Sequence, residues 1–179
     1  MSRKQRIARL LDEAWKTRGA SDYKRGRRLV AEAVELCRED DHESLGRVAH
    51  VYGQFERDLG NREQALNFYL EGFNHYAAGM HPEKMAHALR HVADVRRDLG
   101  DREGSERDYR TAIEMYRNLD PAPAHSLANA LRGFAILLER TGKRDEALQI
   151  FEEAHRLYVQ VGNAPGIEEM GRRVKQLQK

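Results

Sequence analysis

The chain has 179 residues, of which 34% are charged and 40% hydrophobic, with four prolines and a formal net charge of +2. The single cysteine excludes an internal disulfide and a zinc site built from cysteines. So small a net charge gives no bulk attraction to nucleic acid, and no apolar run approaches the roughly 20 residues of a membrane-spanning helix. The first residues lack the apolar stretch of a secretory signal, so we expect a cytoplasmic protein that does not bind membranes.

The first predicted element is a helix that ends near Gly19, within the segment ARLLDEAWKTRG. The next segment, SDYKRGRRLVAEAVELC, places apolar residues at helical spacing and predicts a second helix. Together the two helices form an expected hairpin over residues 3–40. We interpret its basic cluster, Lys24 to Arg28, as a solvent-facing outer surface.

Three further units, residues 41–79, 81–119 and 121–161, repeat one pattern more clearly. Each has a central glycine, which can adopt the left-handed conformation that ends a helix without a Cβ clash. A small residue follows five positions after the glycine, and aromatic residues follow nine and sixteen positions after it. In unit order the glycines are Gly60, Gly100 and Gly142. The residues five positions later are Ala65, Ser105 and Ala147; those nine positions later are Tyr69, Tyr109 and Phe151; and those sixteen positions later are Tyr76, Tyr116 and Tyr158. This spacing predicts two closely crossing helices in each unit.

Short polar residues and prolines between these segments predict where helices begin. Asn61 and Asp101 can cap the second helices of their units. Pro82 and Pro121 each follow a polar residue, and proline is tolerated in the first turn of a helix because its missing N–H has no partner there.

The last segment, residues 164–178, predicts a helix that covers the open end of the array. Its apolar residues form one stripe at helical spacing. The stripe consists of Ile167, Met170, Val174 and Leu177. With no strand pattern anywhere in the sequence, we predict an all-α chain of nine helices.

This arrangement of small and large residues about a glycine turn resembles the tetratricopeptide repeat. The matching residues are Gly53, Gly60, Ala65, Tyr69 and Gly72; Ala93, Gly100, Tyr109 and Ala112; and Ala135, Gly142, Ala147, Phe151 and Ala154. The usual unit has 34 residues, whereas the glycines here are 40 and 42 residues apart, a spacing similar to that of kinesin light chains and bacterial peptide-sensing regulators. The resemblance implies a right-handed α-solenoid of about four hairpins and a capping helix, which binds peptides or proteins in a concave groove and performs no catalysis.

In tetratricopeptide arrays the first helix of each unit lines the groove, and the packing positions leave one face of each such helix free. The candidate groove residues on these faces are Arg9, Arg47, His50, Gln54, Arg57, His87, Arg90, His91, Asp94, Arg97, Asn129 and Arg132. Because arginine forks bind carboxylates, the pattern predicts a basic groove for an acidic peptide segment or a C-terminal carboxylate. The alternative is a solvated charged face on which Arg90 and Arg97 pair with Asp94.

Two other ligands remain open. The arginines could bind a polyanion such as nucleic acid, and His87 and His91 could share a metal ion with Asp94 or His50 as the third ligand, although the nearby arginines would repel a cation. No phosphate-binding loop, nucleophile motif or catalytic carboxylate pair is present. We therefore predict a peptide-binding scaffold with no cofactor and no resident metal, which could also self-associate by edge-to-edge stacking.

Overall fold

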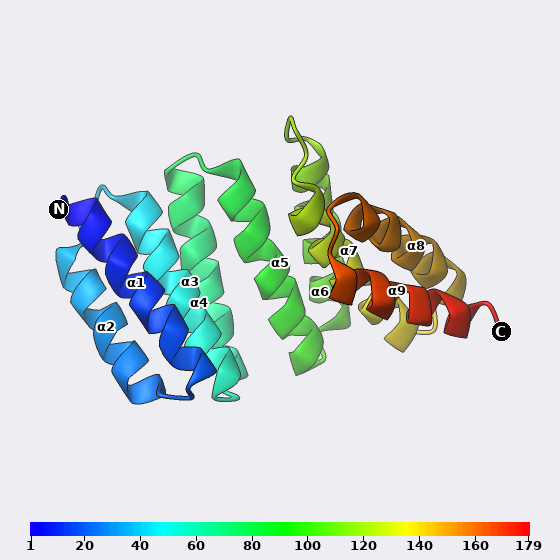
Figure 1. The fold of residues 1–179 in the computed structure, drawn as a ribbon, viewed down its shortest axis with the longest axis horizontal. Coiled ribbons are helices and arrows are strands. Elements are labelled where there is room, and N and C mark those ends of the chain that lie inside the picture. The colour runs from blue at the N-terminus through cyan, green and yellow to red at the C-terminus, as the bar shows by residue number, and fades with distance from the viewer.

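The computed structural model describes residues 1–179 and contains nine α-helices and no strand, which confirms the predicted all-α class. The helices are α1 (Arg3–Gly19), α2 (Tyr23–Leu36), α3 (His42–Asp58), α4 (Arg62–Ala78), α5 (Pro82–Leu99), α6 (Arg102–Arg117), α7 (Ala124–Arg140), α8 (Arg144–Gln160) and α9 (Ala164–Leu177). The first eight form four antiparallel hairpins in chain order, and α9 follows the last hairpin (Figure 1).

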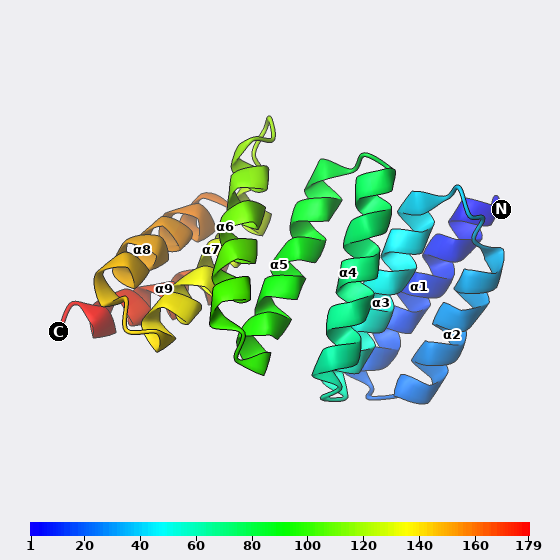
Figure 2. The same cartoon turned by 180° about the vertical axis from the view of Figure 1, so that it is seen from behind.

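The hairpins stack beside one another, so the two chain termini lie at opposite ends of the array (Figure 1). The first helices of the hairpins and α9 lie toward one side of the molecule, and Figure 1 shows α1, α5 and α9 in front. The view from behind shows α2, α4, α6 and α8 in front (Figure 2). Each first helix therefore presents one surface to its partner helix and another to the side that we call the first-helix face.

The predicted glycine turns are confirmed in three units. Gly60, Gly100 and Gly142 have φ angles of 83°, 88° and 80°, in the left-handed region where a residue with a Cβ is strained. Unit one is different because its left-handed residue is Ser21, with φ 54°, whereas Gly19 is the last residue of α1. A left-handed residue thus occurs in the turn of each hairpin, but in the first hairpin this residue is not a glycine.

The small and aromatic positions counted from each glycine are the buried contacts between helices. Ala65, Ser105 and Ala147 have no exposed surface, and the Ser105 hydroxyl donates to the Ala93 carbonyl at 2.8 Å. A Cβ added to Gly53 would lie 2.9 Å from the Tyr69 ring. Small residues therefore occur where a neighbouring ring packs directly on the helix backbone.

The predicted helix starts are correct in part. Asp101 caps α6 by accepting from the Gly104 amide at 2.9 Å. Asn61 precedes α4 but makes no capping bond, because its amide donates instead to the Glu56 carboxylate at 2.7 Å. The predicted start at Pro121 is wrong, since α7 begins at Ala124.

Helix α9 packs on the last hairpin through its apolar stripe. Met170 has no exposed surface and belongs to the same apolar cluster as Phe151 and Leu138. Ile167, Val174 and Leu177 are partly buried against this cluster. The C-terminal end of the chain thus covers apolar surface of α7 and α8.

Candidate functional site

The predicted groove residues are distributed along four first helices, and their guanidinium groups are already paired with carboxylates of the chain. The pairs and their shortest N–O distances are Arg9–Glu13 (2.8 Å), Arg47–Asp12 (3.5 Å), Arg57–Asp98 (3.4 Å), Arg90–Asp94 (2.9 Å), Arg97–Asp98 (3.2 Å) and Arg132–Glu169 (2.8 Å). Several of them join one first helix to the next, as from α1 to α3 and from α3 to α5. The pairs of Arg90 and Arg97 with Asp94, which define the alternative of an internally paired face, are therefore present.

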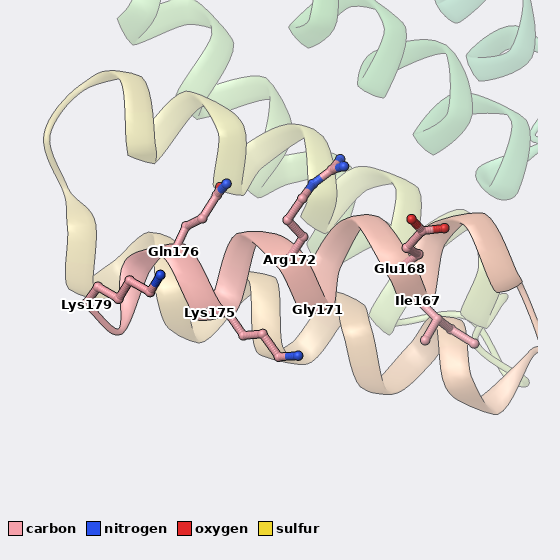
Figure 3. A pocket seen from close by; sticks show the side chains of 7 residues that line it. All are labelled: Ile167, Glu168, Gly171, Arg172, Lys175, Gln176 and Lys179. Atoms are coloured by element: carbon pink, nitrogen blue, oxygen red, sulfur yellow. The ribbon is translucent and has the colours of Figure 1, made fainter.

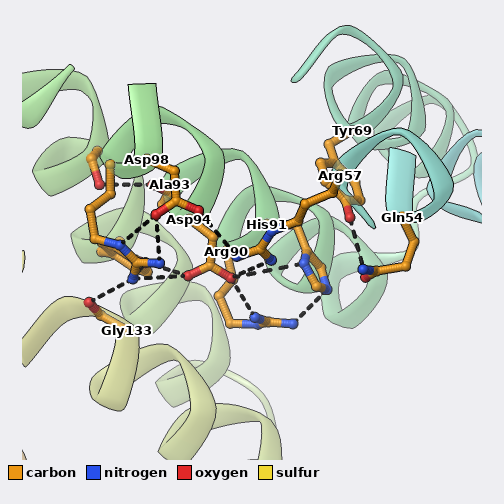
Figure 4. Close-up of polar contacts among 12 residues, drawn as sticks. Gln54, Arg57, Tyr69, Arg90, His91, Ala93, Asp94, Asp98 and Gly133 are labelled. Carbon is orange, nitrogen blue, oxygen red and sulfur yellow. Dashed lines mark hydrogen bonds and ion pairs between the residues drawn. The ribbon is translucent and has the colours of Figure 1, made fainter. Parts of the chain in front are cut away.

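Asp94 is the centre of the largest polar network (Figure 4). Its carboxylate lies 2.9 Å from Arg90, 3.3 Å from Arg97 and 3.6 Å from Arg57, and it accepts a hydrogen bond from the Tyr109 hydroxyl. The side chain of Asp94 is only 9% exposed, and those of Arg90 and Arg97 are 14% and 11% exposed. Burial is also the main reason why the pKa of Tyr109 lies well above its usual range. These charges connect α3, α5 and α6 and are poorly accessible to a ligand.

Three of the predicted residues, His50 from α3 and His87 and His91 from α5, form one cluster. The three ring centroids lie 4.8 Å from one another in every pairing. Burial lowers the pKa of His87 to about 4, with Arg90 contributing, and lowers the pKa values of His50 and His91 well below the usual range. The imidazoles are therefore neutral at pH 7.

A cleft of about 450 Å³ opens beside this cluster, and we call it the α3–α5 cleft. Its lining residues are Glu43, Arg47, His50, Tyr76, Glu83, Lys84, His87 and Ser126, from α3, α4, α5 and α7. Three of these are predicted groove residues. Sequence reasoning missed the others because the charged residues gave no motif, and because the packing pattern assigned Tyr76 to the core, where it is indeed 4% exposed.

The remaining predicted residues do not join this cleft. Arg9 is exposed on α1, and Gln54 accepts from the Tyr69 hydroxyl at 3.3 Å while it donates to Asp58 at 3.0 Å. Asn129 accepts from the Tyr158 hydroxyl at 2.7 Å, and Arg132 is held by Glu169 of α9. Gln54 and Asn129 thus satisfy buried tyrosine hydroxyls of their own hairpins.

A second open cavity, of about 540 Å³, lies along α9 (Figure 3). Its lining consists of Ile167, Glu168, Gly171, Arg172, Lys175, Gln176 and Lys179, of which all but Lys179 belong to α9. Because one helix and the chain end supply every lining residue, this is the outer surface of the last helix. It brings no groups together from different hairpins, in contrast to the α3–α5 cleft.

None of the nine helices combines the length and the hydropathy that a membrane-spanning segment needs.

Comparison with known proteins identifies the repeat. Residues 84–158 match the family profile of the tetratricopeptide repeat, whereas no curated protein sequence matches the chain. Among solved structures, BtubC (BKLC) from P. vanneervenii has a TM-score of 0.71 at 17% identity, over 99% of this chain and 91% of that one. A kinesin light chain-like protein of Podosopora anserina with nearly identical TPR-like repeats has a TM-score of 0.69 at 14% identity, over 97% and 95% of the two chains. At such identities the likeness shows the fold alone.

Proposed function

We propose that the chain, in which residues 84–158 match the tetratricopeptide repeat profile and which shares the fold of solved arrays of TPR-like repeats, is a peptide-binding scaffold whose ligand is an acidic segment bound at the α3–α5 cleft. Tetratricopeptide domains are generally protein-interaction scaffolds and are typically non-enzymatic. The observation that carries the proposal is the cleft itself, because it is where groups from four helices and three hairpins meet on the first-helix face.

Arg47 is the residue that we assign to a ligand carboxylate. Its side chain is 39% exposed, and its one partner, Asp12, is 68% exposed at 3.5 Å. An ion pair this exposed contributes little stability, typically about 0–1 kcal/mol. A ligand carboxylate that accepts two hydrogen bonds from the guanidinium can therefore replace Asp12.

The more buried arginines attract an acidic ligand through their positive charge and do not contact it directly. Arg57, Arg90 and Arg97 share the two carboxylates of Asp94 and Asp98, which leaves a formal excess of one positive charge in this network. The cleft lining itself is balanced, with two cations and two carboxylates among its residues. An acidic ligand thus meets a weakly positive site with one accessible guanidinium, and we expect selectivity to depend on the position of its carboxylate.

The same pairing weakens the polyanion alternative. A protein that binds nucleic acid uses unpaired Lys and Arg side chains to neutralise phosphates, and its affinity falls steeply with salt. Here each predicted groove arginine has a carboxylate partner within the chain. We therefore favour one or two carboxylate contacts over a long row of phosphate contacts.

Selection from a displayed library of random peptides against the purified protein tests the proposal. The unchanged chain should enrich peptides with Asp, Glu or a free C-terminal carboxylate, and Arg47→Glu should lose them. The matched control is Lys24→Glu with Arg28→Glu, which reverses charge at two exposed positions of α2 and should enrich the same peptides as the unchanged chain. Enrichment of the same acidic peptides by Arg47→Glu, or their loss in the α2 variant, would contradict the assignment.

A further inference from the structure

The three imidazoles of His50, His87 and His91 pack against one another in a single cluster between α3 and α5. Each offers a ring nitrogen, and three such nitrogens lie within 4.8 Å of one another. We propose that these histidines form a binding site for one divalent transition-metal ion such as Zn²⁺. Imidazole nitrogen is a ligand preferred by zinc, copper and nickel, whereas Mg²⁺ and Ca²⁺ prefer oxygen.

The three rings have to move together to bind an ion tightly. Zinc–nitrogen bonds of about 2.0–2.1 Å in a tetrahedron place the ligand nitrogens about 3.3 Å apart. The nitrogens therefore need to approach by about 1.5 Å relative to the 4.8 Å limit. His50 and His87 also line the α3–α5 cleft, so their rings have space to turn, and the cleft provides a path for the ion and an open fourth position for water.

Hydrogen bonding at His91 fixes the tautomer of its neutral ring. The Arg90 Nη2 lies 2.6 Å from His91 Nε2, and because a guanidinium has only donors, Nε2 must be the acceptor. The proton of the neutral ring is then on Nδ1, which lies 3.9 Å from the Asp94 carboxylate. A carboxylate behind the N–H of a metal-bound histidine is the usual outer support of zinc sites.

The Nδ1 atoms of His50 and His91 are buried and have no hydrogen-bond partner, and burial of such groups without a partner is unfavourable. A bound ion would satisfy one of them directly if His50 coordinates through Nδ1. It would also draw His91 Nδ1 toward Asp94.

Arg90 opposes the ion in two ways. Its guanidinium occupies the His91 lone pair, and its positive charge repels the cation. Arg90 can release Nε2 and keep its bond to Asp94, which it makes through the other nitrogen, Nη1, at 2.9 Å. Replacing Arg90 with glutamine should therefore raise the metal affinity by at least about tenfold.

Titration of the chelator-treated chain with Zn²⁺ tests the proposal by calorimetry and thermal unfolding. One Zn²⁺ should bind per chain, and the unfolding midpoint should rise by roughly 5–10 °C at a free concentration about 100 times Kd. His50→Gln and His87→Gln should each weaken binding by more than about tenfold. Mg²⁺ should have no effect, and circular dichroism should show that both variants remain helical.

The control uses a second histidine pair, His42 and His75, whose Nδ1 atoms lie 3.4 Å apart on α3 and α4. His75→Gln should leave the Zn²⁺ affinity unchanged. Co²⁺ bound to the unchanged chain should give the absorption of a tetrahedral nitrogen site, and His87→Gln should lose it. The proposal is overturned if the unchanged chain does not bind Zn²⁺, if His75→Gln abolishes binding, or if Arg90→Gln weakens it.

Discussion

The hairpin α5–α6 and the hairpin α7–α8 share one backbone plan but fill the first-helix face differently. Asp94 on α5 accepts from the hydroxyl of Tyr109, which packs against it from α6. The equivalent residues of the next unit are Ile136 and Phe151, and both belong to or pack against one apolar cluster. Where the packing ring has a hydroxyl the facing residue is polar, and where the ring lacks a hydroxyl the facing residue is apolar.

Hairpin α3–α4 follows the same rule, because the Tyr69 hydroxyl donates to Gln54. The ring positions hold each hairpin together, so they vary little in size, whereas the facing positions are free to carry chemistry once the hydroxyl is satisfied. The polar network and the histidine cluster consequently occur in the second and third units, and the fourth unit supplies an apolar core. The comparison separates residues that build the repeat from residues that distinguish one unit from another.

The largest effect should come from removing Asp94. The change Asp94→Ala leaves Arg90 and Arg97 without their shared buried partner, and unpairing buried charges typically costs about 3–5 kcal/mol. The corresponding change in unit four, Ile136→Ala, removes only half-buried apolar surface and should cost less. Urea unfolding followed by circular dichroism measures both, and equal losses would mean that the network is not a stabilising centre.

The packing positions should respond alike in different units. Ala65 and Ala147 have no exposed surface, so leucine at either position overpacks a helix crossing. We expect Ala65→Leu and Ala147→Leu each to lower the free energy of unfolding by about 1–3 kcal/mol. An unchanged thermal midpoint in one of them would show that the two units do not share this crossing.

Acid should destabilise the α3–α5 region. Burial lowers the pKa of His87 to about 4 and lowers those of His50 and His91 well below the usual range. The positive charges of Arg18, Arg57 and Arg90 act in the same direction, whereas Asp94 opposes the shift at His87. Because these pKa values are lower in the folded chain, the unfolded chain binds protons first as the pH decreases. The free energy of unfolding is therefore highest above about pH 6.5, the pKa of a histidine in the unfolded chain, and falls as the pH decreases toward the pKa in the folded chain.

The expected loss is about 0.7 kcal/mol per histidine between pH 7 and pH 6. Urea unfolding at several pH values, with a chelator present, measures it. In the variant His87→Gln, stability should fall less steeply with decreasing pH, by the contribution of one histidine. Identical slopes in the unchanged chain and His87→Gln would contradict the burial of a neutral imidazole.

The sequence predicts the repeat far better than the site. Glycine turns and the positions of Ala147 or Tyr109 depend on local spacing, so they can be counted along the chain. Whether Arg90 is free or paired depends on Asp94 beside it and on the burial of both, which spacing alone left as two open alternatives. The contribution of Tyr76 and Lys84 to the cleft depends on how successive hairpins stack, and a single sequence does not contain that information.

Hydrogen exchange of the backbone amides, with and without the most strongly enriched acidic peptide, tests the proposed binding site most directly. We predict added protection in α3 and α5, centred on Arg47, His50 and His87, and no change along α9. Protection confined to α9, at the cavity around Arg172 and Lys175, would contradict the account and place the ligand on the end of the array.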